Sequence, residues 1–273
     1  MPLTKLQSDI LKLLAAHRTD ESFVAGGTAL NREGPRMSND IDIFHDREQS
    51  LAGTAEADVA ALSKAGLEVQ WIEPRTSAKM SAQIIRGEET TKLDWVADSD
   101  FRYFPAVPDN EFGFVLHPID LATNKAAAAA DRREPRDIVD LVTIHETILP
   151  LGAVITAALG RFPGPSPEGM LGEIRWHSRL TAPELQALAT TQPLDAAGLR
   201  VRIQKMLEDA ERFVGDIPSD AVGCLFLDNG KPVQPDLTAL ERYFRHHATR
   251  RGRWPGSPEV DSEMIRRHVG DKE

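Results

Sequence analysis

Cysteine is nearly missing from this chain, since Cys224 is the only one among 273 residues. A single cysteine excludes an internal disulfide and a cysteine zinc cluster, and it is typical of proteins from a reducing compartment. The sequence also lacks an excess of positive charge, because 32 Lys and Arg residues face 42 Asp and Glu residues, for a net charge of −10. A chain this acidic is not a general nucleic-acid binder, so any such contact must come from a local basic patch.

Targeting and membrane signals are missing too. The first residues do not show a basic segment followed by an unbroken apolar core, so we expect no signal peptide. The most apolar stretch, residues 141–159, contains His145, Glu146 and Pro150 and is interpreted as two core helices with a break between them. Hydrophobic residues make up 41% and charged residues 27%, an ordinary balance for a globular protein. We therefore expect a cytoplasmic protein without membrane contact.

Hydrophobic periodicity predicts an α+β fold in two parts. Residues 1–115 have the pattern of a small mixed-sheet domain. Its predicted elements are a helix over 4–17, strands over 22–25 and 40–44, a helical turn from Thr28, a helix over 51–65, and strands over 67–72, 80–85 and 91–96. Residues 116–273 are predicted to be mainly helical. The expected helices cover 119–131, 135–149, 182–190, 195–214, 235–247 and 258–268, with a loop over 161–170 that is rich in Pro and Gly.

Two aspartates two residues apart are the strongest chemical signal. Asp40 and Asp42 alternate with Ile41 and Ile43 in a predicted strand, so both carboxylates lie on one face and both isoleucines on the other. Adjacent carboxylates repel each other unless a positive charge lies between them, and Mg²⁺ with triphosphate oxygens is a natural occupant. The alternative is a solvated pair on an exposed strand face, which an Asp-x-Asp pattern alone does not exclude.

A glycine pair lies just upstream of these aspartates. Gly26-Gly27 allows the backbone to approach a phosphate, and the amides of the turn that begins at Thr28 favour anions. The alternative is a tight strand-to-helix turn. The two motifs strengthen each other because a metal–phosphate site needs both oxygen ligands and amide donors.

In this combination the chain resembles the DNA polymerase β-type nucleotidyltransferase superfamily. More narrowly, residues 26–30 followed by Arg36, Ser38 and residues 40–44 resemble the AbiEii-type nucleotidyltransferase proteins, many of which are toxins of toxin–antitoxin systems. The resemblance covers about residues 20–145, and Thr28 stands where many superfamily members have serine. It implies a nucleotidyltransferase core over 1–115 and, over 116–273, a helical domain that shapes the nucleotide and acceptor site.

Later positions in the sequence also match the pattern of these nucleotidyltransferases. A third carboxylate is expected from a later strand, and Asp94 fills that position. A helix lysine and an Arg-Asp pair that opens the next helix are matched by Lys125 and by Arg136-Asp137. The implied catalytic residues are Asp40, Asp42, Asp94, Lys125 and Asp137. The implied nucleotide-binding residues are Gly26, Gly27, Thr28, Arg36, Ser38 and Lys125.

The resemblance also implies cofactors. Asp40, Asp42 and Asp94 would hold two Mg²⁺ ions, or Mn²⁺ in their place, roughly 3.5–4 Å apart. The nucleoside triphosphate (NTP) would be the co-substrate, and Lys125 would neutralise its charge.

Several of these residues have a simpler interpretation. Asp94 is also suited to an ion pair with Lys92, and Lys125 to a solvated helix surface. Asp137 would either interact with the helix dipole after Pro135 or orient Lys125. The basic segment 242–254, with interleaved aromatics, suits nucleic acid but equally suits a solvated helix end.

We therefore expect an enzyme that moves a nucleoside monophosphate (NMP) from an NTP to an acceptor and releases pyrophosphate. The resemblance favours a toxin that acts on RNA, such as tRNA, and it implies an antitoxin protein as a partner. A small-molecule acceptor such as an antibiotic hydroxyl is the nearest alternative. A nucleotide-sugar glycosyltransferase and a non-catalytic nucleotide-binding module remain as further alternatives.

Overall fold

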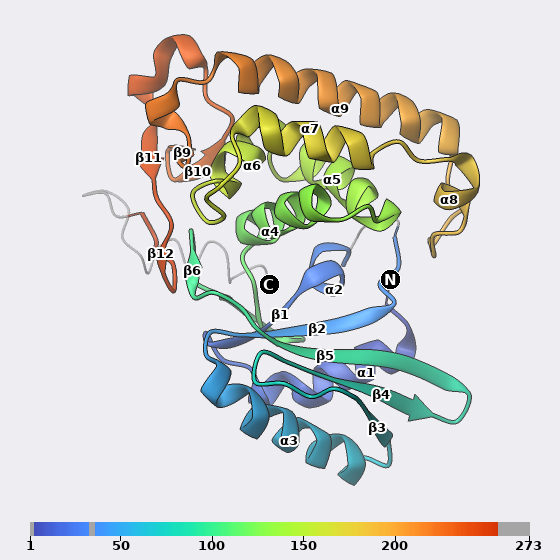
Figure 1. Ribbon diagram of the computed structural model, residues 1–273. Helices are drawn as coiled ribbons and strands as arrows, with labels where there is room; N and C mark the ends of the chain where they lie inside the picture. The colour runs from blue at the N-terminus through green and yellow to red at the C-terminus, as the bar shows by residue number, and fades with distance from the viewer. Residues whose placement is uncertain (1–2, 33–35, 256–273) are drawn as a thin grey trace. The chain divides into compact units, whose positions relative to one another are not determined.

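The computed structural model describes residues 3–32 and 36–255 of the chain (Figure 1). The chain forms two compact units. The first unit comprises the described residues up to His117 together with those from Arg250 onward, and the helical unit comprises Pro118–Thr249. A mixed sheet in the first unit and a set of helices in the second confirm the predicted α+β class.

A seven-stranded sheet forms the centre of the first unit. In sheet order its strands are β3 (Glu68–Ile72), β4 (Lys79–Arg86), β5 (Glu89–Ala97), β2 (Asp40–His45), β1 (Ser22–Ala25), β8 (Gly113–Val115) and β7 (Val107–Asp109). The β2–β5 and β1–β8 pairs are parallel and the others antiparallel, so the sheet is mixed. Two short strands, β6 (Phe101–Arg102) and β12 (Thr249–Arg250), lie outside this sheet.

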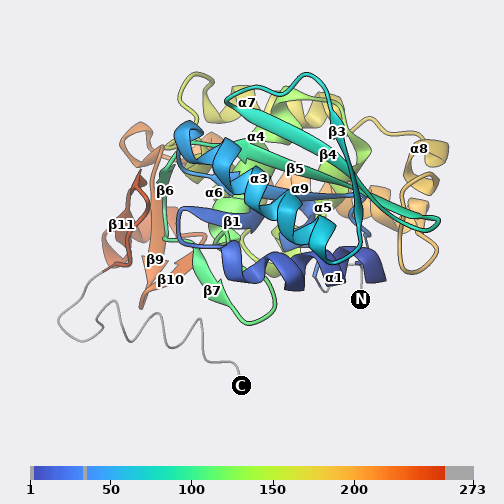
Figure 2. The same ribbon diagram turned by 90° about the horizontal axis from the view of Figure 1, so that it is seen from below.

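One face of this sheet forms the hydrophobic core of the first unit. Helices α1 (Lys5–Leu14) and α3 (Glu48–Lys64) cover that face, as Figure 2 shows from below. Ile41 and Ile43 point into this core and are fully buried, because the side chains of β2 alternate between the two faces. The same alternation leaves Asp40 and Asp42 on the opposite face, where they are only partly buried.

A buried charge cluster ties α3 to the sheet. The Asp58 carboxylate accepts two hydrogen bonds from Arg18, of 2.7 and 2.6 Å, and one of 2.8 Å from the Trp95 indole nitrogen. His17 Nδ1 lies 2.7 Å from the same carboxylate. Nearby, burial and the charge of Arg18 lower the pKa of His45 to about 4, so this core histidine is neutral at pH 7. The cluster thus keeps one buried arginine and one buried carboxylate paired.

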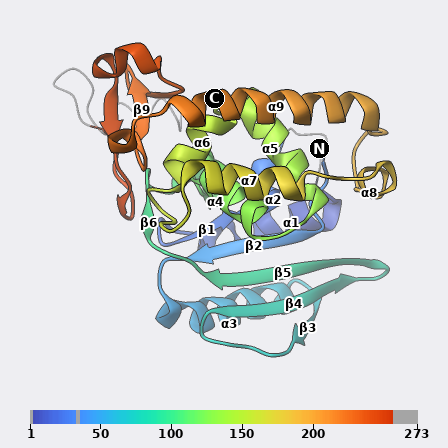
Figure 3. The same ribbon diagram turned by 45° about the horizontal axis from the view of Figure 1, so that its top comes forward.

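The helical unit is built from six α-helices among the described residues. They are α4 (Pro118–Asp131), α5 (Pro135–Thr147), α6 (Leu151–Ala158), α7 (Pro167–His177), α8 (Ala182–Gln186) and α9 (Ala196–Asp216). The long helix α9 packs against α5, α6, α7 and α8, as Figure 3 shows. Two 3₁₀ turns, Ser219–Ala221 and Leu237–Arg242, accompany a small sheet in the order β10 (Lys231–Val233), β9 (Leu225–Asp228), β11 (Phe244–His246).

Two predictions for the helical unit were wrong. Residues 161–170 were expected to be loop, which holds for 161–166 but not for 167–170, because α7 begins at Pro167 with Ser166 as its N-cap and with Met170, Leu171 and Ile174 buried. Two glycines in this helix, at 169 and 172, lower its intrinsic propensity, and burial of its apolar side overrides them. The helix expected over 235–247 is instead a 3₁₀ turn followed by β11, which pairs with β9. The helix expected over 258–268 falls outside the described residues.

In the described part of the chain, no helix alone is both long and apolar enough to cross a bilayer. Helices α5 and α6, bent by 109° at their junction, reach that length and composition only when they are taken together.

Removing the Asp58 carboxylate should destabilise the first unit strongly. We expect Asp58→Leu to lower the free energy of unfolding by roughly 3–5 kcal/mol, because it leaves Arg18 buried and unpaired. The double variant Asp58→Leu/Arg18→Leu should recover most of that loss, since the uncompensated charge is gone. Urea unfolding followed by circular dichroism measures both. A double variant as unstable as the single one would contradict this explanation.

Candidate functional site

The polar face of the sheet presents three carboxylates on two neighbouring strands. In the β2–β5 register Asp42 lies opposite Asp94, and on the other side of β2 it lies opposite Ala25, the last residue of β1. Paired residues of a sheet point to the same face, so Asp94 shares the face of Asp40 and Asp42. The register therefore brings together the three acidic residues that the sequence predicted.

Two lysines already hold Asp94. Its Oδ2 atom lies 2.8 Å from Nζ of Lys92 and 3.0 Å from Nζ of Lys79. Burial alone would raise the pKa of Asp94, but the hydrogen bonds from these lysines hold it below its ordinary value, so the group is ionised at neutral pH. The ion pair between Asp94 and Lys92, which the sequence offered as the simpler interpretation of Asp94, is thus present. Lys79 makes a second ion pair with the same carboxylate.

The glycine pair makes room for the site. Gly26 has a φ of +62°, and a β-carbon there would collide with the carboxylate of Asp42. A β-carbon at Gly27 would lie 2.5 Å from Nη2 of Arg36 and 3.1 Å from Oγ of Ser38. Both positions therefore need glycine for a close approach. The helix α2 (Gly26–Leu30) begins at Gly26, two residues before the predicted turn at Thr28.

Thr28 and Ser38 support the backbone of β2. The hydroxyl of Thr28 donates to the backbone oxygen of Asp40 at 2.6 Å, and that of Ser38 contacts the same oxygen at 2.9 Å. Both residues are buried. Ser38 Oγ also lies 3.2 Å from Oδ1 of Asp40. These hydroxyls position the start of the strand that carries the aspartates, which is a different task from the predicted phosphate contact.

Gln7 is a supporting residue that the sequence analysis did not identify. Its side-chain amide is buried and donates to the backbone oxygen of Ser38 at 2.9 Å and to Oγ1 of Thr91 at 3.2 Å. Its Oε1 accepts from the backbone of Thr4, which closes a capping box at the start of α1. Gln7 thereby links α1, the loop before β2, and β5. The sequence feature that could have identified Gln7 is its position as a polar residue on the apolar side of a predicted helix.

The helical unit carries a second charge cluster. Nζ of Lys125 on α4 lies 2.8 Å from Asp137 Oδ1 and 3.0 Å from Asp140 Oδ2, both on α5. Both carboxylates are fully buried, and Arg132 Nε bonds Asp137 Oδ2 at 2.8 Å. Burial would raise the pKa of Asp137, but the charge of Lys125 and the bond from Arg132 lower it. Lys125 is therefore held by two carboxylates rather than solvated, and Asp137 contacts it directly.

The carboxylates of the first unit suit a hard divalent cation. Asp40 and Asp42 supply oxygens on one face, and Asp94 Oδ1 is a buried oxygen for which no hydrogen-bond partner is found among the described residues. As the side chains stand, the described part of the chain holds no group of three or more His, Cys, Asp or Glu residues gathered around one metal position. The residues thus fit a cation bound by Asp40 and Asp42, with Asp94 engaged by its lysines.

Two histidines and the basic segment of residues 242–254 have structural contacts. His177 Nδ1 lies 2.8 Å from the backbone oxygen of Ala129, and His145 Nδ1 accepts from the backbone amide of Leu151. In the basic segment, Arg245 lies on β11 and pairs with Asp220 at 2.9 Å. Residues 244–246 of this segment therefore form a strand of a small sheet in the helical unit, whereas residues 250–254 belong to the first unit.

Comparisons with known proteins identify the family. The profile of a family described as "Nucleotidyl transferase AbiEii toxin, Type IV TA system" matches residues 11–223. Among solved structures, the chain is similar to MenT4, a nucleotidyltransferase toxin from Mycobacterium tuberculosis H37Rv, with 17% identity, a TM-score of 0.54, and coverage of 79% of this chain and 84% of that one. A protein from H. pylori named as a nucleotidyltransferase gives 18% identity, a TM-score of 0.42, and coverage of 76% and 94%. No curated protein sequence matches this chain. At this identity the MenT4 likeness shows a shared fold alone.

Alanine at Gly26 should cost more stability than alanine at Gly87. The two positions have φ values of +62° and +61°, so both substitutions pay the same backbone penalty of roughly 1–2 kcal/mol. A β-carbon at Gly87 meets nothing within 4 Å, whereas one at Gly26 meets the Asp42 carboxylate. Urea unfolding measures the loss of stability in Gly26→Ala and in Gly87→Ala. The difference between the two losses is the cost of placing a β-carbon against the Asp42 carboxylate. Equal losses would show that the Asp42 carboxylate does not occupy that space.

Proposed function

Because the chain belongs to the AbiEii nucleotidyl transferase toxin family, we propose that the polar face of its seven-stranded sheet binds the triphosphate of an NTP and that an RNA hydroxyl is the acceptor. The protein is a nucleotidyltransferase enzyme and a toxin of a toxin–antitoxin system. The family assignment implies an NTP as substrate and an antitoxin as partner. The observation that carries the proposal is the pairing of Asp40 and Asp42 on one face of β2, directly beside the Gly26 turn.

Asp40 and Asp42 are the proposed ligands of divalent metal, Mg²⁺ or Mn²⁺. Bound metal would supply charge neutralisation at the phosphates and lower the pKa of an attacking hydroxyl. The aspartates share a face, and their backbone is fixed by the hydroxyls of Thr28 and Ser38, so their spacing is set before substrate binds. Whether the site takes one ion or two depends on Asp94, which we propose as the third carboxylate.

Asp94 and its lysines form the proposed switchable part of the site. Lys79 and Lys92 hold Asp94 Oδ2 while its Oδ1 is buried, so the carboxylate is ionised and already oriented. When substrate oxygens are present, the same lysines are suited to bind them instead, because an ammonium group on a flexible stem moves readily between oxygen partners. Asp94 would then be available as the base for the acceptor hydroxyl.

The glycine turn and Arg36 are the proposed triphosphate contacts. Gly26 leaves no side chain between the backbone and the carboxylate of Asp42, and Gly27 leaves none between the backbone and Arg36. Arg36 is buried against Gly27, and its Nη1 donates to the backbone oxygen of Met37 at 2.9 Å, which fixes the guanidinium beside the turn. A fixed guanidinium with several donors recognises phosphate oxygens well.

Lys125 is the proposed cation for the outgoing phosphates, with Asp137 as its positioning residue. Asp137 and Asp140 hold Nζ of Lys125 at hydrogen-bonding distance from two sides. Desolvation of two carboxylates around one ammonium is costly, and the two contacts hold the Lys125 side chain in one position. A lysine that served only solubility would not need two buried partners.

Label transfer tests the function directly. The protein, Mg²⁺ and each α-labelled NTP in turn are incubated with total cellular RNA, and the products are separated on a denaturing gel. We expect label on a discrete RNA band and release of pyrophosphate. Asp42→Asn should lower the rate by about 100-fold or more, because it removes a metal-binding charge without changing side-chain size.

Asp9→Asn is the matched control, since Asp9 is an exposed aspartate of the same unit that pairs with Arg86. It should retain the wild-type rate. Label that persists at the wild-type rate in Asp42→Asn would contradict the proposed site. Label that appears only when a panel of hydroxyl-bearing small molecules replaces the RNA would contradict the proposed acceptor and leave the site intact.

A further inference from the structure

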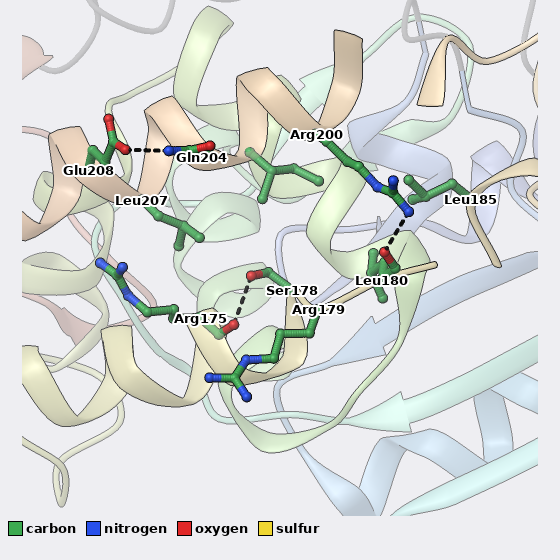
Figure 4. Close-up of a pocket in the computed structure, with 10 residues that line it drawn as sticks. Arg175, Ser178, Arg179, Leu180, Leu185, Arg200, Gln204, Leu207 and Glu208 are labelled. Atoms are coloured by element: carbon green, nitrogen blue, oxygen red, sulfur yellow. Dashed lines mark hydrogen bonds between the residues drawn. The ribbon is translucent and has the colours of Figure 1, made fainter. Parts of the chain in front are cut away.

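A pocket of about 400 Å³ lies in the helical unit where α7, α8 and α9 meet (Figure 4). Its size falls in the range of sites that bind small organic molecules. Arg175, Arg179 and Arg200 line it, and Glu208 is the one acidic residue of its lining. This positive excess stands in a chain whose net charge is −10. The pocket is therefore a local basic patch, and in so acidic a chain any nucleic-acid contact is expected to come from such a patch.

The loop after α7 that carries Arg179 is fixed from two sides. Arg133 donates to the backbone oxygen of Arg179 at 3.0 Å, and Arg200 donates to the backbone oxygen of Leu180 at 3.3 Å. Arg133 also pairs with Glu184 of α8 at 2.6 Å. These contacts order the rim, so the arginine side chains project from a fixed backbone. Ordered rims bind ligands with less loss of conformational freedom.

The pocket combines charge with flat and apolar surfaces. Leu180, Leu185 and Leu207 line it and are buried. Beside it Trp176 exposes 58% of its surface, which is unusual for so large an apolar side chain. The guanidinium of Arg179 lies 4.4 Å from the centre of the Trp176 ring. An arginine stacked on an exposed tryptophan is the pairing that proteins use for single-stranded bases and their phosphates.

We propose that this pocket binds a nucleotide of the single-stranded RNA acceptor. Arg179 contacts a backbone phosphate, Trp176 stacks on a base, and the leucines receive the adjoining apolar surface of the nucleotide. Arg175 is engaged by Glu211 at 2.9 Å. This inference rests on the proposed function, because it names where the RNA acceptor is held. An acidic peptide would satisfy the arginines, but it would leave the exposed tryptophan without a flat partner.

The pocket is joined to the Lys125 cluster by two adjacent residues. Arg132 bonds Asp137, which holds Lys125, and Arg133 bonds the backbone of Arg179 at the pocket rim. Both arginines lie in the turn between α4 and α5. A strand held at the pocket is therefore anchored to the same turn that orients the proposed triphosphate-binding lysine. This connection favours the acceptor over an unrelated ligand.

Binding of a short RNA tests the proposal without requiring catalysis. A fluorescein-labelled single-stranded RNA of about 12 nucleotides is titrated with the protein, and anisotropy is recorded from roughly 50 to 200 mM NaCl. The proteins are wild type, Arg179→Gln, Trp176→Leu and the control Arg202→Gln. Arg202 lies on α9, does not line the pocket, and pairs with Glu146. Circular dichroism checks that each variant is folded.

Arg179→Gln should weaken RNA binding by about 10-fold and reduce the slope of log K against log salt by about 0.7 for one lost phosphate contact. Trp176→Leu should weaken binding by about 10-fold with the slope unchanged, because stacking releases no counterions. Arg202→Gln should match the wild type. Wild-type protein that does not bind this RNA, or variants that bind it as well as the wild type, would overturn the proposal. Poly-glutamate that displaces the RNA at equal concentration and depends on Arg179 would assign the pocket to an acidic peptide instead.

Label transfer separates this inference from the function itself. In the pocket variants, KM for RNA should rise by about 10-fold while KM for NTP stays unchanged. Transfer to RNA that is unaffected by both variants would overturn the pocket and leave the function standing. RNA binding that depends on Arg179 and Trp176, without any transfer from wild-type protein, would overturn the RNA acceptor activity and support the pocket.

Discussion

The site depends on the alternation of side chains along β2, which places Asp40 and Asp42 on one face of the sheet. Asp40 and Asp42 cannot turn away from each other without reversing the strand, because Ile41 and Ile43 occupy the buried face. The hydrophobic core under the sheet therefore fixes the aspartates on the opposite face. The core thereby places two carboxylate groups on one face, an arrangement of oxygen donors that suits a divalent cation.

The surroundings of β2 show how this strand is held in position. Thr28 and Ser38 bond the backbone oxygen of Asp40, and Gln7 bonds the backbone of Ser38 from α1. Gly26 allows the Asp42 carboxylate to lie where a β-carbon would otherwise be. Side chains of modest size thus support the strand that carries both aspartates. In the helical unit, Asp137 and Asp140 fix Lys125 by the opposite arrangement, in which two negative groups hold one positive group.

Local patterns in the sequence predicted the parts of the site that depend on local geometry. The alternation of Asp40–Ile43 predicted a two-faced strand, which the structure has. The glycine pair was predicted to let the backbone approach a phosphate; in the structure the Asp42 carboxylate lies where a β-carbon of Gly26 would be. Asp137 and Asp140 lie three residues apart on α5, so their carboxylates share one side of the helix. Family resemblance supplied Asp94 and Lys125, whose partners lie on other elements.

Features that depend on the pairing of distant segments could not be predicted from local sequence patterns. Lys79 reaches Asp94 from β4 only because the β4–β5 register sets Ser81 opposite Asp94. Helix α7 forms despite its two glycines because its apolar residues are buried. Strand β11 forms where a helix was predicted because it pairs with β9. In each case a tertiary contact outweighed a local propensity.

The most direct test of the central claim is Mn²⁺ binding followed by electron paramagnetic resonance, in the presence of a non-hydrolysable NTP analogue. The account predicts that wild-type protein and Asp9→Asn bind Mn²⁺ equally, and that Asp40→Asn and Asp42→Asn each weaken the binding by about 10-fold or more. Mn²⁺ binding of wild-type strength in both Asp40→Asn and Asp42→Asn would contradict the assignment of this strand face as the metal–nucleotide site.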